Sequence, residues 1–307
     1  MMTAPHTLLM MFSTFSLNLA PSSDTMVESA RNQITDALPK PQIKGRSPPA
    51  GRLARKAPSI MVPSMMACGL NHVTTKAVVK SFHTGRELAR TCLGNGVSMG
   101  IHESQSRFYE NIIGRSRAFC SVLLPWLKEH FPAQLEDVTE EQFYRMVNRS
   151  RPSLIRTEAD ELTYCLHIMV RYELEKQMFA GTITAHDLPA AWNRLYKEYL
   201  GVDVPSDREG VLQDSHWANG NIGYFPSYAI GSAYGAQYLL EMQKDLDVEA
   251  AVRSGKLTAI NRWLEEKIWK YGCMKDPVAL FESVCGPFRP EEYVAYLEKK
   301  VTDIYDL

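Results

Sequence analysis

Between residues 96 and 307, apolar side chains recur at the three- and four-residue spacing of amphipathic helices, and glycine or proline punctuates the stretches. In the first stretch, residues 95–116, this spacing places Ile101, Phe108 and Ile112 on one face, which we expect to pack against a core. No alternation of strands with helices is visible in the sequence. The pattern therefore predicts a nearly all-helical fold.

The boundaries of several further helices can be predicted from the residues that begin or end them. Thr157 followed by Asp160 resembles a capping box and predicts a long helix that ends at Gly181. Pro125 and Pro132 are expected to break the helical pattern before it.

Three more helical regions are predicted over residues 184–200, 248–269 and 290–305. Between the first two, residues 210–228 contain glycines that surround histidine, tryptophan and tyrosine side chains. Glycine permits tight turns, so this stretch is predicted to be a short irregular or β segment.

The aromatic side chains divide the chain into two regions. Only Phe12, Phe15 and Phe82 precede residue 96, whereas the other 27 aromatic residues begin at Phe108. Because aromatic side chains contribute strongly to cores, we expect residues 96–307 to form the folded domain. Residues 1–95 are poorly patterned and are expected to be disordered or not native coding sequence.

The net charge of -1 gives no reason to expect nucleic acid or an anionic membrane as a partner. Residues 40–56 are locally basic and could be a nuclear-localisation or RNA-binding patch. A solvated linker is the simpler interpretation, because no aromatic residues lie between the charges. The apolar stretch 7–19 is shorter than a membrane helix requires.

The six cysteines form neither a C-x-x-C pair nor a short even spacing, which is typical of free thiols in a reducing compartment. We therefore expect a cytoplasmic protein. A serine hydrolase is not supported, because the sequence contains no G-x-S-x-G.

Three polar positions are candidates for a functional site, and each has a simpler structural interpretation. Glu103 could pair with Arg107 on a helix surface. Arg156 could clamp a carboxylate or form a structural pair with Glu158 or Asp160. His216 could be a loop histidine bonded to Asp214 or a donor that polarises a substrate carbonyl.

Three segments together resemble the signatures of the thermostable (Taq-type) metallocarboxypeptidase family. They are IHESQSRFYENIIGRS at residues 101–116, IRTEADE at residues 155–161 and GVLQDSHWANGNIGYFPSYAIG at residues 210–231. The resemblance covers about residues 96–307, in the family's order. It implies a helical, cleft-bearing metallopeptidase fold, usually dimeric, that holds one divalent metal, generally zinc and sometimes cobalt. It also implies removal of single residues from the C-termini of peptides.

The resemblance also implies a role for each matching residue. Glu103 would be a carboxylate ligand of the metal. Arg156 would bind the terminal carboxylate of the peptide substrate, because its planar fork matches that group. His216 and Tyr228 would act in catalysis by stabilising the oxyanion, and Tyr224 would line the substrate site.

The sequence departs from the family at the metal site. The family's H-E-x-x-H motif, which supplies two histidine ligands and the general base, is absent. At the corresponding place, residues 82–90 contain His83 and Glu87, four residues apart, which could join Glu103 in an altered site. The alternative to an active carboxypeptidase is therefore a pseudoenzyme or truncated remnant that binds peptide C-termini or pairs with an intact partner.

Overall fold

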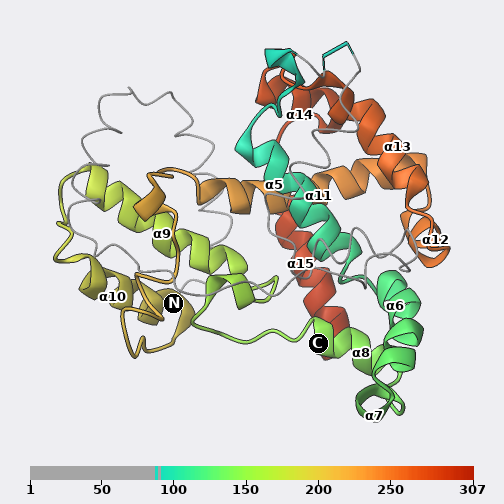
Figure 1. Cartoon of the computed structure of the whole chain (residues 1–307), viewed down its shortest axis with the longest axis horizontal. Helices are drawn as coiled ribbons and strands as arrows, with labels where there is room; N and C mark the ends of the chain where they lie inside the picture. The colour runs from blue at the N-terminus through green and yellow to red at the C-terminus, as the bar shows by residue number, and fades with distance from the viewer. Residues whose placement is uncertain (1–86, 89–90) are drawn as a thin grey trace. The chain divides into compact units, whose positions relative to one another are not determined.

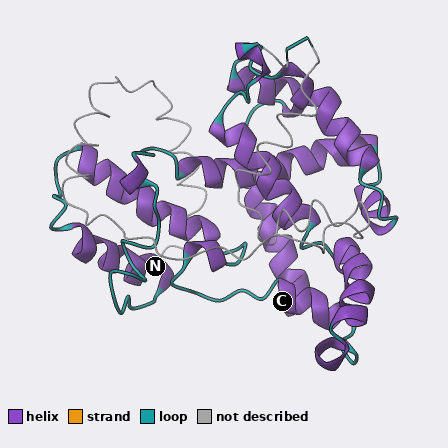
Figure 2. Cartoon of the chain, in the orientation of Figure 1, coloured by secondary structure: helices purple, strands orange, loops and turns teal. Residues whose placement is uncertain are grey.

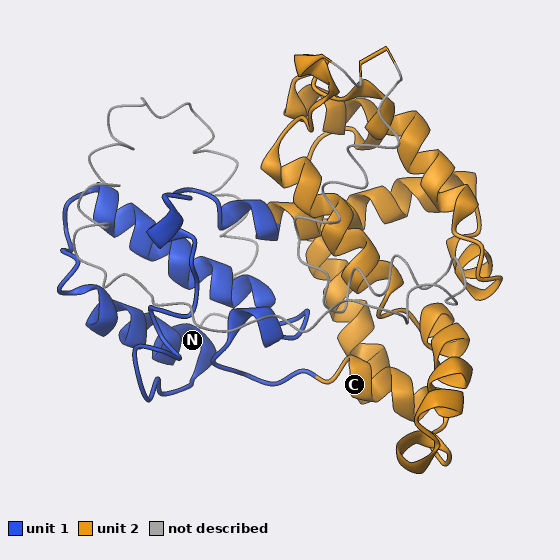
Figure 3. Ribbon diagram, in the orientation of Figure 1, with its two compact units in different colours: residues 1–56, 150–229 blue, residues 57–149, 230–307 orange. Residues whose placement is uncertain are grey.

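The computed structural model describes residues 87–88 and 91–307, which are the coloured parts of Figure 1. The chain divides into two compact units, shown in Figure 3. Of the described residues, unit 1 contains 150–229, and unit 2 contains those up to 149 together with 230–307. Sequence patterning alone predicted one domain over the same residues, without this division.

The regular structure in the described part of the chain is helical, as Figure 2 shows, and this confirms the predicted fold class. Among the described residues, unit 2 contains one 3-10 turn ahead of its first α-helix and the larger number of helices. In chain order they are η2 (Cys92–Gly94), α5 (Met99–Arg107), the π-helical segment η3 (Phe108–Ile113), α6 (Arg117–His130), α7 (Pro132–Leu135), α8 (Glu140–Val147), the larger part of α11 (Pro226–Asp245), α12 (Val248–Arg253), α13 (Thr258–Lys267), η6 (Trp269–Tyr271), α14 (Pro277–Cys285) and α15 (Pro290–Tyr305).

The helix predicted over residues 95–116 is present, but its geometry changes along its length. Ser98 caps α5 by accepting a hydrogen bond from the Ile101 backbone N–H at 3.2 Å. From Phe108 the backbone widens into a π-helix, which ends where the Gly114 N–H donates to the Tyr109 carbonyl at 2.8 Å. Hydrophobic periodicity does not reveal this change, because both geometries keep the apolar side chains on the core side.

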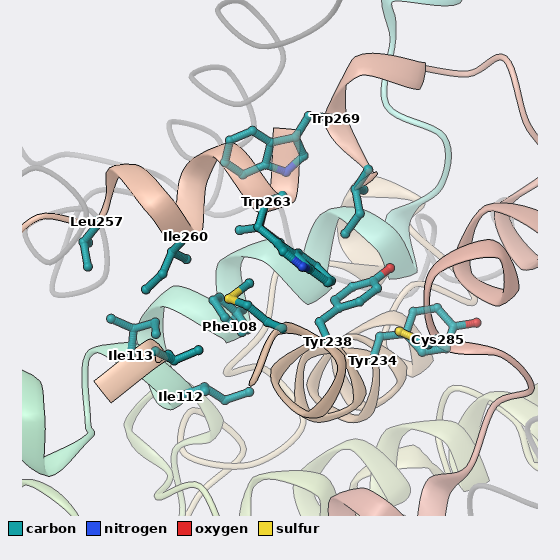
Figure 4. Packing of buried hydrophobic residues seen from close by; sticks show 14 of the residues in the cluster. Phe108, Ile112, Ile113, Tyr234, Tyr238, Leu257, Ile260, Trp263, Trp269 and Cys285 are labelled. Atoms are coloured by element: carbon teal, nitrogen blue, oxygen red, sulfur yellow. The ribbon is translucent and has the colours of Figure 1, made fainter. Parts of the chain in front are cut away.

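The main hydrophobic core of unit 2 gathers side chains from α5, the π-helical segment, α11, α13 and α14 (Figure 4). Phe108, Ile260 and Leu264 are completely buried in it. Ile101 and Ile112, which the periodicity predicted to face a core, belong to the same cluster. Each such side chain stabilises the fold by about 1.5–3 kcal/mol relative to an exposed position.

Unit 1 is built on two long helices, α9 (Tyr164–Phe179) and α10 (Leu188–Leu200). The short turns η4 (Arg156–Glu158) and η5 (Trp217–Asn219) lie in its connecting segments. Trp192 of α10 is almost completely buried. Residues 210–228 are irregular apart from η5 and the first turn of α11, and no strand occurs there.

Several predicted helix boundaries were wrong. The region predicted over residues 184–200 begins at Leu188, and the region over residues 248–269 is divided into α12, α13 and η6. Pro125 does not break α6, because it lies on the exposed side, where water can solvate the carbonyl that loses its partner. The helix predicted to begin after Thr157 begins at Tyr164. The Asp160 carboxylate instead accepts the backbone N–H groups of Leu162 and Thr163, both at 3.0 Å, in the turn that precedes the helix.

Candidate functional site

The centre of unit 1 holds two guanidinium groups around one carboxylate. Arg156 donates from Nε and Nη2 to Asp214 Oδ1 at 3.0 and 2.6 Å. Arg171 donates from Nε to Asp214 Oδ2 at 2.7 Å. Arg171 is fully buried, and Arg156 is only 6% exposed. We call these three residues the Arg–Asp–Arg cluster.

The amide of Gln213 positions both arginines. Its Oε1 accepts hydrogen bonds from the Arg156 backbone N–H and from Arg171 Nη2, each at 2.9 Å. Its Nε2 donates to the Leu154 carbonyl at 3.0 Å, which ties the loop of Gln213 to the segment before Arg156. The segment of residues 154–156 and the loop of residues 213–214 are therefore joined through Gln213 as well as through the Arg156–Asp214 pair.

The cluster carries more positive than negative charge. Burial alone would raise the pKa of Asp214, but Arg171 and Arg156 outweigh this effect and lower it to about 2. The nearby imidazole of His167 has its pKa lowered to about 3 by burial and by Arg171, so it is neutral. Two guanidinium groups thus share one carboxylate in a site with little access to water.

Arg156 retains hydrogen-bonding capacity. Its Nη1 donates to the Tyr164 hydroxyl at 3.0 Å, and its other side-chain bonds go to Asp214. A guanidinium has five N–H donors, so within the described residues one N–H on each terminal nitrogen has no acceptor. The acidic partner of Arg156 is Asp214, from another segment. The structural pair with Glu158 or Asp160 that the sequence suggested is therefore replaced by one that the sequence did not suggest.

His216 lies beside the tyrosines that the family motif singled out. Its Nε2 is 3.0 Å from the Tyr228 hydroxyl, and its Nδ1 is 3.8 Å from Asp214 Oδ1. The Tyr224 ring centroid is 5.5 Å from that of His216 and 5.2 Å from that of Tyr228. The Arg156 guanidinium carbon lies 4.9 Å from the Tyr228 ring centroid, within cation–π range.

Glu175 of α9 anchors the loop that carries His216. Its Oε1 accepts hydrogen bonds from Trp217 Nε1 at 2.8 Å and from the Gly223 backbone N–H at 3.2 Å. The side chain is 4% exposed. Burial raises the pKa of Glu175 to about 7, although the Trp217 and Gly223 hydrogen bonds oppose the shift.

Glu103 lies in unit 2, on α5, and is 1% exposed. The Ser106 hydroxyl, one helical turn further on, donates to its Oε2 at 3.0 Å. Gly231 of α11 packs directly on this position. A Cβ on Gly231 would lie 2.6 Å from the Glu103 Cβ, so only glycine permits the observed approach of the two helices.

The described residues do not complete a metal site. No group of three histidine, cysteine, aspartate or glutamate side chains with suitable geometry occurs among residues 87–88 and 91–307. A catalytic zinc requires three protein ligands and a water molecule. Glu87 is an exposed turn residue, and His83 lies outside the described residues, so their contribution to a site with Glu103 stays a prediction.

Of the predicted site residues, Arg156, His216, Tyr224 and Tyr228 come together in unit 1, whereas Glu103 belongs to unit 2. Sequence reasoning missed Arg171 and Glu175. Both follow His167 at intervals of four residues on α9, and all three are buried. A polar stripe at helical spacing on a largely apolar helix was the signal that could have revealed them.

This arrangement of helices and buried charges defines an all-helical metallopeptidase fold, as its solved structural neighbours show. The chain matches the family described as carboxypeptidase Taq (M32) metallopeptidase over residues 64–301, and it belongs to that family.

Among curated relatives, the chain is 44% identical over 220 residues to carboxypeptidase 1 of Bacillus subtilis, covering 71% of this chain and 44% of the relative. It is 44% identical over 212 residues to thermostable carboxypeptidase 1 of Pyrococcus furiosus, covering 68% of this chain and 42% of the relative. The chain thus spans less than half the length of these relatives.

Solved structures give the same result for the fold. The crystal structure of the M32 carboxypeptidase from Deinococcus radiodurans R1 superposes with a TM-score of 0.73 at 40% identity, over 77% of this chain and 48% of that one. Metallocarboxypeptidase 1 of Trypanosoma cruzi superposes with a TM-score of 0.69 at 37% identity, over 75% of this chain and 46% of that one.

Proposed function

We propose that this chain acts in carboxypeptidase chemistry, the release of single residues from peptide C-termini, with unit 1 recognising the terminal carboxylate. The observation that carries the proposal is the Arg–Asp–Arg cluster, in which Arg156 keeps an unused N–H on each terminal nitrogen. A peptide carboxylate would accept these donors and balance the excess positive charge. An internal peptide bond offers no such anion, so the cluster favours an exopeptidase.

His216, Tyr224 and Tyr228 are suited to the reacting end of such a substrate. The tyrosine hydroxyl and the imidazole, 3.0 Å apart, can both donate hydrogen bonds. Donors held in a partly desolvated site stabilise negative charge that develops on a carbonyl oxygen. We assign His216 and Tyr228 to this role and Tyr224 to contact with the substrate.

A divalent metal, zinc or cobalt, would supply the activated water in this family's chemistry. Within the described residues Glu103 and Glu87 are the proposed ligands, and no group of three suitable side chains occurs there, which does not fit a complete catalytic centre. Peptide hydrolysis therefore requires ligands beyond those described, and we assign no step of the reaction to the metal here.

The test is to load the purified chain with zinc or cobalt, measure bound metal by elemental analysis, and assay release of the terminal amino acid from a blocked dipeptide. The proposal expects near-stoichiometric metal and turnover, both lost in Glu103→Ala. Glu249→Ala, an exposed acidic residue that pairs with Arg253, is the matched control and should change neither. Turnover that persists in Glu103→Ala would overturn the assignment of this carboxylate.

A second function, binding of peptide C-termini without hydrolysis, is favoured by the missing H-E-x-x-H motif. It would use the same cluster in unit 1 and would suit a homodimer or a pairing with an intact copy. Saturable peptide binding without bound metal or turnover would select this function. Loss of that binding in Arg156→Ala would assign it to the cluster.

No helix in the described part of the chain has the length and apolar character needed to cross a membrane. From the family membership we propose peptides as partners, and we propose no nucleic-acid partner.

A further inference from the structure

Two segments of unit 2 that are far apart in the sequence are in backbone contact. The Cys273 N–H donates to the Leu93 carbonyl at 2.8 Å. Gly272, which precedes it, has a φ of 50°, and a Cβ there would lie 2.2 Å from the same carbonyl oxygen. Only glycine at position 272 allows this approach. The backbone of residues 92–96 is therefore packed against residues 272–273.

This contact brings two free cysteines together. The Cys273 Sγ lies 3.9 Å from the Cys92 carbonyl oxygen and 2.9 Å from the Asn95 carbonyl oxygen. A carbonyl oxygen is about 2.4 Å from its own Cα, so Cys273 Sγ lies at most about 6.3 Å from the Cys92 Cα. The two cysteines are therefore neighbours, and the proposed bond requires their Cα atoms to come to about 4.4–6.8 Å from each other.

The two thiols also differ from the other described cysteines in access to solvent. Cys92 is exposed and Cys273 is half-buried, whereas Cys120, Cys165 and Cys285 are buried. Burial also raises the pKa of Cys120 to about 11 and that of Cys285 to about 12. The thiolate is the reactive form. Among the described cysteines, Cys92 and Cys273 are therefore the two that an oxidant reaches most easily.

We propose that Cys92 and Cys273 form a reversible disulfide under oxidising conditions. The bond would fasten the segment that leads to Ser98, the N-cap of α5, to the segment that follows η6. Because α5 carries Glu103, oxidation would fix the position where that helix begins.

Oxidised glutathione is a sufficient co-reactant. The Cys92 thiolate attacks one sulfur of the glutathione disulfide, forms a mixed disulfide and releases one reduced glutathione. The Cys273 thiolate then attacks the Cys92 sulfur and releases the second. Both cysteines lose their protons, and the two electrons removed from the thiols reduce one oxidised glutathione to two thiols.

Peptide mapping tests the proposal directly. The full chain is reduced, incubated with oxidised glutathione, alkylated and digested with trypsin. We expect residues 91–107 joined to residues 271–275 by a bond that reductant removes. The thiol titre of the denatured protein should be two below the six of the sequence, and the Tm should be higher than that of the reduced protein.

Two serine variants complete the design. Cys92→Ser should abolish the joined peptide and the redox-dependent change in Tm, whereas Cys120→Ser should retain both. The proposal fails if the joined peptide is absent after oxidation, if Cys92 remains a glutathione adduct, or if it pairs with Cys68 or with another chain.

Discussion

At the scale of single residues, Asp214 has the largest electrostatic role in unit 1, because it contacts two buried guanidinium groups. A buried ion pair costs desolvation energy, and removing one member leaves the other charge without compensation. Here the loss of one carboxylate would leave two cations, Arg156 and Arg171, facing each other. We therefore expect replacement of Asp214 to destabilise the fold more than replacement of either arginine.

We expect Asp214→Asn to lower the free energy of unfolding by about 3–5 kcal/mol. Asp203→Asn removes a highly exposed partner of Lys197 and should cost less than about 1 kcal/mol. Urea denaturation followed by circular dichroism measures both. Because the pKa of Asp214 is lowered to about 2, its stabilising effect is complete above its ordinary value near 3.8 and is lost as the pH falls toward 2. Equal losses in the two variants would contradict the prediction.

Glu175 should make stability depend on pH in the opposite direction. Its pKa is raised from 4.5 to about 7 by burial, so the folded state binds the proton more tightly than the unfolded chain. The resulting stabilisation is complete below pH 4.5 and is lost as the pH rises through 7, by about 3 kcal/mol in total.

Glu175→Gln keeps an acceptor for Trp217 and Gly223 but cannot ionise. Its unfolding free energy relative to the wild type should therefore increase between pH 5 and pH 8, as measured by urea titrations at both values. Glu173→Gln, on the same helix but partly exposed and paired with Lys176, is the control and should show no comparable change. A constant difference between wild type and Glu175→Gln would refute the raised pKa.

At the scale of secondary structure elements, sequence patterns located helices with one exposed side better than fully buried ones. The terminal helix was predicted at the observed bounds, Pro290–Tyr305, because proline begins it and its apolar residues form a single stripe. Helix α9 is buried on several sides, including at His167 and Arg171, so periodicity gave no clear start. The pattern also did not predict the π-helical turns of residues 108–113.

The crossing of α5 and α11 gives a prediction at this scale. Gly231→Ala would place a Cβ 2.7 Å from the Glu103 carbonyl carbon, so the helices must separate, at a cost of about 1–3 kcal/mol. Gly100→Ala, on α5, meets no described atom closer than 3.5 Å and should be neutral or stabilise by up to about 1 kcal/mol. Thermal unfolding compares the two variants. A Gly231→Ala protein as stable as Gly100→Ala would show that the crossing is not tightly packed.

At the scale of the whole molecule, the chain leaves unit 2 after residue 149, forms unit 1, and returns at residue 230. Motif residues such as Arg156 and His216 could be selected from the sequence because their segments match a family in order. Their partners could not, since Asp214 and Arg171 meet Arg156 only after α9 and the glycine-rich loop have folded together. The aromatic distribution gave no sign that residues 150–229 and 230–307 belong to two different units.

Binding of a peptide carboxylate should stabilise the native chain as a whole, because a ligand that binds only the folded state shifts the unfolding equilibrium. At a peptide concentration 100 times its Kd, the gain is about 2.7 kcal/mol, which a thermal shift assay resolves. A dipeptide with a free C-terminus should raise the Tm, whereas the same dipeptide with a C-terminal amide should not, because the amide lacks the charge that balances Arg156.

Arg156→Ala should lose the difference between the two peptides, and Arg194→Ala, which removes an exposed guanidinium on α10, should keep it. Because Arg156 also stabilises Asp214, the variant's own Tm will fall, so the informative quantity is the change in Tm on adding peptide. Equal shifts with acid and amide in the wild type would mean that peptide binding does not depend on the carboxylate, and the exopeptidase assignment of unit 1 would then be wrong.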